Sequence, residues 1–130
     1  MADNRQINEL YQQIAKELIE ARPELAYIKN SDVSIICLSS QHKKKTKKKT
    51  VFGQCEKIAE KYKWGIPCDF TITVFEPNVC GFTPEQIKIL IFHELLHVGI
   101  DGDKLFINPH DFEDFKAIID KFGVDWNVVE

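Results

Sequence analysis

Apolar side chains recur at helical spacing over residues 4–21, near the start of the chain. The stripe consists of Ile7, Leu10, Tyr11, Ile14 and Leu18. Residues three and four positions apart lie on the same face of an α-helix, so this pattern predicts one amphipathic helix that packs against a core. Pro23 follows, and because proline cannot continue a helix, we expect the helix to end there.

Two runs rich in β-branched residues predict strands. Residues 32–38 (DVSIICL) form the first run. Residues 69–75 (DFTITVF) form the clearer one, in which Phe70, Ile72 and Val74 alternate with Thr71, Thr73 and Phe75. Residues 50–62 leave two structures open, because their apolar positions fit a helical period while TVFGQC could equally form a strand paired with the preceding one.

The best-delimited helix follows Thr83. The Thr83 hydroxyl can accept from the backbone N–H of Gln86, the Gln86 side chain can reach back to Thr83, and Pro84 suits the first helical position. The body of this helix is predicted over residues 87–98. Gly99 fits a left-handed stop.

A second helix is predicted to open at Asn108 and Pro109, again as a cap followed by proline. It places four large apolar residues on one face: Phe112, Phe115, Ile119 and Phe122. We expect it to stop at Gly123 and to be joined to the preceding helix by a loop over residues 100–109.

Composition indicates an ordinary soluble globular protein. The 130 residues suit a single domain, residues 1–130, and 44% are hydrophobic and 28% charged. The net charge of −3 implies no partner by itself. The first residues are polar and no apolar run reaches bilayer length, so we expect a cytoplasmic protein with no membrane contact. The sequence does not decide the oligomeric state.

Six of the seven residues 43–49 are lysines. Charges this close repel one another and cannot be buried together. We therefore expect a mobile, solvated loop over about residues 39–50, at the tip of a hairpin or connection.

The four cysteines are Cys37, Cys55, Cys68 and Cys80, and none forms a C-x-x-C pair. We expect buried, reduced thiols that pack as small apolar side chains. A thiolate metal site is the alternative.

The best-delimited helix contains His93, Glu94 and His97 as an H-E-x-x-H motif. Residues four apart on a helix stack on one face, so both imidazoles can ligate one ion, which zinc sites do at roughly 2.0–2.1 Å. Glu94 lies about 100° around the helix, where its carboxylate can take a proton from a metal-activated water. The flanking positions are apolar nearly all round, and three buried polar groups would need partners there. We therefore prefer a zinc site to two satisfied core histidines.

A catalytic zinc keeps three protein ligands and one open position, so a third ligand is needed. His110 is our choice, since it falls in the first turn of the helix after the motif. Asp103, Asp101 and Glu113 are the acidic alternatives. Asp111 and Asp114 suit groups that orient an imidazole N–H, or simply acids of a first helical turn.

Three segments of the chain carry a family resemblance: DFTITVFEPN, PEQIKILIFHELLHVGI and PHDFEDFKAIIDKFGVDW. They resemble the phage-type metallopeptidases, a compact branch near the SprT-like zincins, over roughly residues 55–126. The resemblance implies an α+β minimal zincin with an N-terminal helix, a small antiparallel sheet, the motif helix and a C-terminal helix. It also implies that His93, His97 and His110 ligate one Zn²⁺ per chain, that Glu94 is the catalytic acid/base, and that residues 51–55 form a strand.

The sequence leaves three functions to compare. The first is a zinc-dependent peptidase that hydrolyses peptide bonds in a protein or peptide substrate, with Glu94 as general base. The second is a non-proteolytic binding protein on a zincin fold. The third is association with nucleic acid, because each lysine of residues 43–49 can neutralise a phosphate, although the run lacks aromatic or arginine residues for base contacts. Another divalent metal in place of zinc stays open.

Overall fold

The computed structural model describes residues 5–46 and 49–108. Its main sheet has the strand order β1-β2-β6-β5, in which these strands span Arg5–Ile7, Ile35–Ser40, Phe70–Phe75 and Gly53–Lys57. Two further pairs of strands form separate ribbons, β3 (Lys45–Thr46) with β4 (Lys49–Thr50) and β7 (Val98–Asp101) with β8 (Lys104–Ile107).

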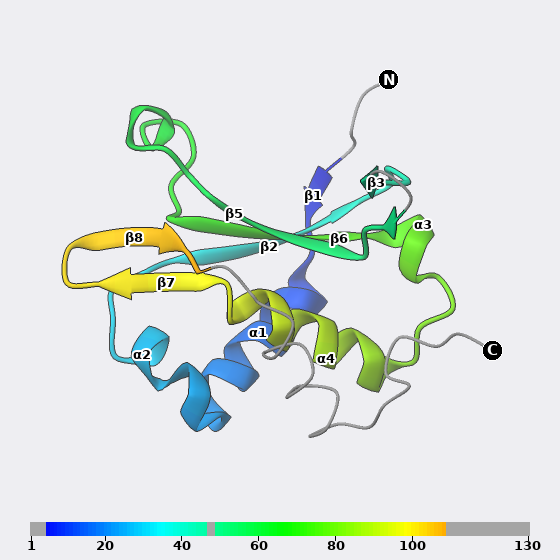
Figure 1. Cartoon of the computed structure of the whole chain (residues 1–130), viewed down its shortest axis with the longest axis horizontal. Coiled ribbons are helices and arrows are strands. Elements are labelled where there is room, and N and C mark those ends of the chain that lie inside the picture. The colour runs from blue at the N-terminus through cyan, green and yellow to red at the C-terminus, as the bar shows by residue number, and fades with distance from the viewer. Residues whose placement is uncertain (1–4, 47–48, 109–130) are drawn as a thin grey trace.

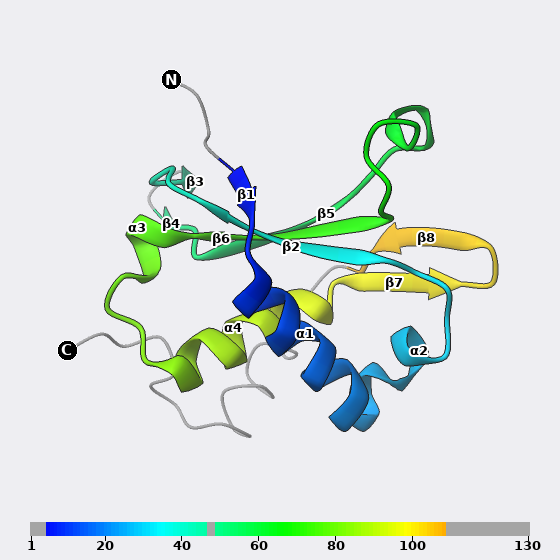
Figure 2. The same cartoon turned by 180° about the vertical axis from the view of Figure 1, so that it is seen from behind.

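Helices cover one face of the main sheet. Figures 1 and 2 show α1, α2 and α4 on that face from opposite sides. The helices and short 3₁₀ turns span Glu9–Ala21 (α1), Pro23–Leu25 (η1), Ala26–Lys29 (α2), Glu60–Tyr62 (η2), Glu76–Val79 (α3) and Pro84–Leu95 (α4). No helix in the described ranges is both long enough and apolar enough to cross a bilayer.

The prediction of a small antiparallel sheet is wrong for the central pair of strands. Strand β6 pairs antiparallel with β5 but parallel with β2, from Ile35 opposite Phe70 to Ser40 opposite Phe75. Parallel neighbours need a long crossover, and here the crossover carries β3, β4 and β5. The sheet is therefore mixed, within the α+β class that the sequence predicts.

Strand β6 is buried on both faces. Phe70, Ile72 and Val74 belong to the core beneath the helices, as their alternation predicts. Thr73 and Phe75, on the opposite face, are also fully buried. Arg5 covers both, with its Nη1 atom 3.1 Å from Thr73 Oγ1 and its guanidinium 5.9 Å from the centre of the Phe75 ring. Long polar side chains thus replace a second helical layer on this face.

Helix α1 begins later than the stripe of apolar residues predicts. Asn8 caps it by accepting a hydrogen bond from the Tyr11 N–H at 2.9 Å, and the extended backbone of Asn8 ends the preceding strand β1. Ile7 therefore lies on β1 and is exposed, as is Leu10. The buried positions of the helix are Tyr11, Ala15 and Leu18, and the helix ends before Pro23 as expected.

The middle of the chain resolves the ambiguity at residues 50–62. Residues 53–57 form β5, followed by the η2 turn, so the strand alternative is right. Its partner is β6, not the preceding strand β2. The predicted first strand also occurs, shifted to Ile35–Ser40. Of the lysine run, Lys45 lies on β3 and Lys49 on β4.

Three of the four cysteines are buried or half-buried, and Cys80 is exposed, contrary to our expectation of four buried thiols. All four are free. Burial raises the pKa of the Cys37 thiol to about 12, which keeps it protonated and unreactive.

Candidate metal centre

Helix α4 starts as its sequence predicts. Gln86 N–H donates to Thr83 Oγ1 at 3.2 Å, Thr83 N–H donates to Gln86 Oε1 at 2.8 Å, and Pro84 occupies the first turn. The capping box fixes where the helix begins and so sets which residues its last turn presents.

The end of α4 differs from the prediction. The helix stops at Leu95, and His97 lies in a tight turn. The His97 N–H donates to the Glu94 carbonyl at 3.1 Å. Gly99 does not terminate the helix but lies in β7, opposite Phe106. A Cβ atom at Gly99 would lie 2.4 Å from Phe106 Cε2, so the glycine is needed for the close approach of an aromatic ring.

The predicted loop over residues 100–109 is largely the β7–β8 hairpin. Gly102 provides its turn, with φ of 61°. Each strand has only four residues, too few for an alternation of apolar and polar side chains to be recognised in the sequence. The helix predicted from Asn108 to Gly123 lies beyond the described residues, apart from Asn108 itself.

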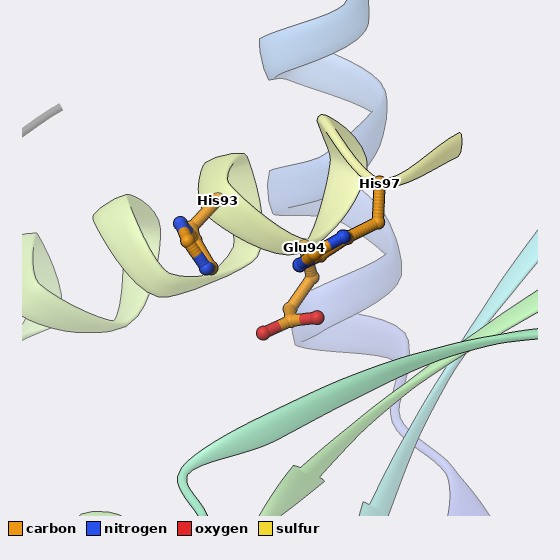
Figure 3. A group of neighbouring side chains, drawn as sticks. All are labelled: His93, Glu94 and His97. Atoms are coloured by element: carbon orange, nitrogen blue, oxygen red, sulfur yellow. The ribbon is translucent and has the colours of Figure 1, made fainter. Parts of the chain in front are cut away.

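The motif side chains converge. One ligand atom from each of His93, Glu94 and His97 lies within 4.8 Å of the other two. The imidazole centres are 5.3 Å apart, with the rings nearly perpendicular. Figure 3 shows the two rings and the carboxylate on the same side of the chain, with the Glu94 carboxylate directed toward the neighbouring strands.

The donor set fits a divalent metal. Two atoms that each lie about 2.1 Å from one zinc are at most about 4.2 Å apart, so the observed spacing needs only small side-chain rotations to close on an ion. Imidazole nitrogens are typical ligands of zinc, copper, iron and nickel, so the set implies a metal without naming which one.

Asn108 holds the His97 end of this group. Its N–H donates to the His97 carbonyl at 2.6 Å, and its own carbonyl oxygen lies 2.8 Å from His97 Nδ1. The Asn108 Nδ2 atom also donates to the Leu96 carbonyl at 3.3 Å. Because a carbonyl can only accept, the proton of the neutral ring lies on Nδ1, and the Nε2 lone pair is left for a metal. The sequence analysis missed this contact, although Asn108 precedes proline, which restricts its backbone to extended conformations.

Glu94 lies beneath β5. The side chain is 5% exposed, and this burial raises the pKa of its carboxyl to about 8. A Cβ atom at Gly53 would lie 3.3 Å from Glu94 Cγ and equally close to the Thr73 carbonyl oxygen. Cys55, two residues further along β5, has its thiol pKa raised by burial and then by the nearby Glu94 charge. The absence of a side chain at Gly53 therefore leaves space for Glu94. Like the contact of Asn108, this role of Gly53 was not found by the sequence analysis.

The remaining predicted ligands lie elsewhere or outside the described residues. Asp101 and Asp103 line a surface groove at the turn end of the β7–β8 hairpin, together with Lys57, Glu60, Lys104, Leu105 and Phe106. Neither belongs to the group formed by His93, Glu94 and His97. His110, Asp111, Glu113 and Asp114 are outside the described residues. Within the described ranges, none of the four cysteines joins a group of candidate metal ligands.

A family comparison agrees with this geometry. The sequence profile described as "Putative phage metallopeptidase" matches residues 5–129, nearly the whole chain. The chain belongs to this phage metallopeptidase family. Searches of curated proteins and of solved structures gave no match. Family membership implies a metal and a protein substrate. Among the described residues, the group of His93, Glu94 and His97 could hold that metal.

Proposed function

We propose that this phage metallopeptidase is a zinc-dependent peptidase in which His93 and His97 hold the metal and Glu94 is the general base. The observation that carries the proposal is the convergence of these three side chains within 4.8 Å. Zinc, when bound, would activate a water molecule and polarise the substrate carbonyl. Every other part of the chemistry falls to residues of the chain.

Glu94 is placed to move protons. Its carboxylate is on the same side of the chain as both imidazoles, yet it comes from a position next to His93 and not from the i, i+4 pair. A carboxylate oxygen there can accept a proton from the attacking water and later donate it to the leaving amine nitrogen. Burial raises the carboxyl pKa to about 8 in the metal-free protein. The positive charge of a bound zinc would lower this pKa and so favour the ionised carboxylate that accepts the proton.

His110 is proposed as the third ligand, and Asn108 supports that choice. The backbone of Asn108 is hydrogen-bonded to His97 on both its N–H and its carbonyl side. His110 is two residues further on, which limits its Cα atom to about 7 Å from that of Asn108. Asp101, by contrast, lies at the far end of β7. A strand rises roughly 10 Å over the three residues from Val98, the neighbour of His97, to Asp101.

The test combines metal content with hydrolysis of an unstructured protein such as casein. Wild-type protein is expected to contain one zinc per chain by elemental analysis and to release peptides. Glu94→Gln is expected to keep the metal and lose turnover, because the amide is nearly isosteric but cannot accept the proton. Glu85→Gln, an exposed change on the same helix, is the matched control and is expected to behave like wild type.

Two results would contradict the proposal. Full zinc occupancy in a His93→Ala, His97→Ala double variant would remove the metal site. Undiminished hydrolysis by Glu94→Gln would remove Glu94 from the mechanism. If wild-type protein binds zinc but cleaves no substrate, the non-proteolytic binding protein becomes the better description.

A further inference from the structure

The groove at the turn end of the β7–β8 hairpin has no part in the metal chemistry. We call it the hairpin groove. It has a volume of about 560 Å³, which lies within the range of pockets that hold small ligands or side chains. One wall is the end of β5 and the η2 turn, with Lys57 and Glu60, and the other is β8, with Leu105 and Phe106. Figures 1 and 2 show the segment after β5 and the hairpin turn extending toward the same end of the molecule.

Both walls of the hairpin groove lead to the candidate metal centre. Strands β5 and β8 contact each other. Along β5, Lys57 is four residues from Gly53, which closely approaches the carboxylate of the H-E-x-x-H motif. Along β8, Leu105 is three residues from Asn108, whose carbonyl contacts His97. Strand residues rise about 3.3 Å each, so these steps are roughly 13 Å and 10 Å. An extended peptide with one residue in the groove therefore reaches the metal centre three or four residues later.

Phe106 provides most of the exposed apolar surface of the hairpin groove. Its ring is 42% exposed. The ring packs over Gly99 on the neighbouring strand, where no Cβ atom could fit. Leu105 is half-buried and packs against the core, which fixes this wall to the rest of the fold. The ring of Phe106 is thus held by the hairpin while part of its surface stays open to another apolar side chain.

The charges around the hairpin groove balance. Glu60 forms an ion pair with Lys63 at 3.0 Å. The other charged groups are two lysines and two aspartates: Lys57, Lys104, Asp101 and Asp103. All four are exposed, and Asp101 lies opposite Lys104 in the hairpin. A groove without an excess of either sign does not select a ligand by its charge, which leaves the apolar surface as the feature that discriminates.

We infer that the hairpin groove binds a large apolar side chain of the polypeptide substrate, aromatic or long aliphatic, three or four residues from the bond that is cleaved. This inference rests on the proposed function. Phe106 then determines specificity without touching the reacting atoms. Contact with its ring stabilises the bound substrate and the transition state equally, so it lowers KM and leaves kcat unchanged.

The first test measures binding and does not depend on turnover. The ¹⁵N-labelled wild-type chain is titrated with the N-acetyl amides of phenylalanine, leucine, alanine, arginine and glutamate. The phenylalanine and leucine amides are expected to shift the backbone N–H signals of Lys57, Lys104 and Phe106 in a saturable way at millimolar concentration. The other three amides are expected to give no saturable shift there.

Two results of this titration would overturn the inference. One is the absence of a saturable shift at these residues with every amide. The other is tighter binding of the arginine or glutamate amide than of the phenylalanine amide, which would show that charge selects the ligand.

The second test measures cleavage of quenched fluorescent peptides. They are built around a bond that the wild-type protein cleaves in casein, located by mass spectrometry of the released peptides. Each position near the bond is changed in turn between phenylalanine and serine. At the third or fourth position on one side, phenylalanine is expected to lower KM at least tenfold relative to serine, with kcat within about twofold.

Phe106→Ala is expected to reduce that difference in KM to less than about threefold, with zinc content unchanged, because the surface that recognises the side chain is removed. Ile66→Ala is the matched control, since Ile66 is 40% exposed and does not line the groove. It is expected to keep the wild-type preference. An undiminished preference in Phe106→Ala would overturn the inference.

The two tests separate the failure of this inference from the failure of the proposed function. Cleavage without a preference for phenylalanine at any position would contradict the role of the groove and leave the peptidase in place. Saturable shifts with the phenylalanine amide, together with no cleavage of any peptide or of casein, would contradict the proposed function and with it the assignment of the groove to a substrate.

Discussion

The Nδ1 atom of His97 lies 2.8 Å from the carbonyl oxygen of Asn108. This contact determines which ring nitrogen is protonated, and so which nitrogen faces a metal. We expect His97 in the metal-free protein to be the Nδ1–H tautomer at a pH where the ring is neutral. Long-range ¹H–¹⁵N correlation spectra distinguish the two tautomers. A predominantly Nε2–H ring at His97 would show that the Asn108 contact does not orient it.

Gly53→Ala is expected to impair catalysis more than folding. The added Cβ would lie 3.3 Å from Glu94 Cγ, from Leu90 Cδ1 and from the Thr73 carbonyl oxygen, so these neighbours must move by a few tenths of an ångström, and any movement of Glu94 displaces its carboxylate. We expect kcat/KM to fall at least tenfold, a loss of about 1.4 kcal/mol in transition-state stabilisation, with zinc content unchanged.

Gly65→Ala is the matched control for that variant, because a Cβ at Gly65 meets nothing within 4 Å. It is expected to keep wild-type kcat/KM. Equal activity of the two alanine variants would show that the space at Gly53 is not required by Glu94.

Gly99→Ala is expected to destabilise the protein through Phe106. The new Cβ would overlap the Phe106 ring, so this ring, which is 42% exposed, must move away from the β7 backbone. Overpacking of this kind costs about 1–3 kcal/mol. Denaturant unfolding of Gly99→Ala, Phe106→Ala and the double variant measures the coupling. Introducing Gly99→Ala into the Phe106→Ala background should cost less than in wild type, and an undiminished cost would exclude the ring as the cause.

His110→Ala is expected to weaken zinc by at least tenfold and to abolish hydrolysis, whereas Asp103→Ala is expected to do neither. The physical reason is the placement of Asn108 beside His97 and of Asp103 at the hairpin turn. Competition with a chromogenic chelator gives the zinc affinities. The opposite ranking of the two variants would transfer the third ligand position to the carboxylate.

Asp69 makes stability depend on acid pH. Burial tends to raise the pKa of Asp69, but hydrogen bonds from Lys63 Nζ at 2.7 Å and from the Ser34 N–H at 2.9 Å outweigh it and hold the pKa below its usual value. A carboxyl with a lowered folded pKa stabilises the protein above its unfolded pKa, and the contribution is lost as pH falls through the folded pKa.

Asp69→Asn is therefore expected to lower stability at neutral pH by on the order of 1 kcal/mol, with allowance for solvent screening, and by less as the pH falls below about 4. Thermal melts across this range, with Asp103→Asn as an exposed control, provide the measurement. A deficit that does not depend on pH would indicate lost packing and not lost charge.

Local signals in the sequence predicted much of this structure. The capping box of Thr83 and Gln86 lies within one helical turn, so its geometry follows from helix parameters. The spacing of His93 and His97 predicted that they meet, although His97 lies in the turn just after α4 and not in the helix. Strands β2 and β6 were found because burial selects β-branched and aromatic residues. Charge repulsion predicted that the lysine run is exposed, and Lys43 and Lys45 are.

Long-range partners explain what the sequence did not predict. Whether β2 pairs with β6, and in which direction, depends on residues such as Ile35 and Phe70 that no local pattern connects. Gly99 was predicted to stop the helix, but the actual constraint on this residue is the ring of Phe106 across the hairpin, which no local pattern reveals. Asn108 looked only like a helix cap, since the sequence cannot show that its carbonyl meets His97.

The candidate metal centre combines a contact between residues close in sequence with a contact between residues far apart in sequence, and the two need not form at the same stage of folding. His93 and His97 are four residues apart and approach each other as soon as one helical turn exists, whereas Gly53 and Glu94 are brought together only by the completed sheet. If zinc is the metal, we expect unfolded or partly folded chains to retain some affinity for it through the two imidazoles. Because zinc then binds both folded and unfolded molecules, saturating zinc should raise the melting temperature by less than its affinity for the native protein alone would give.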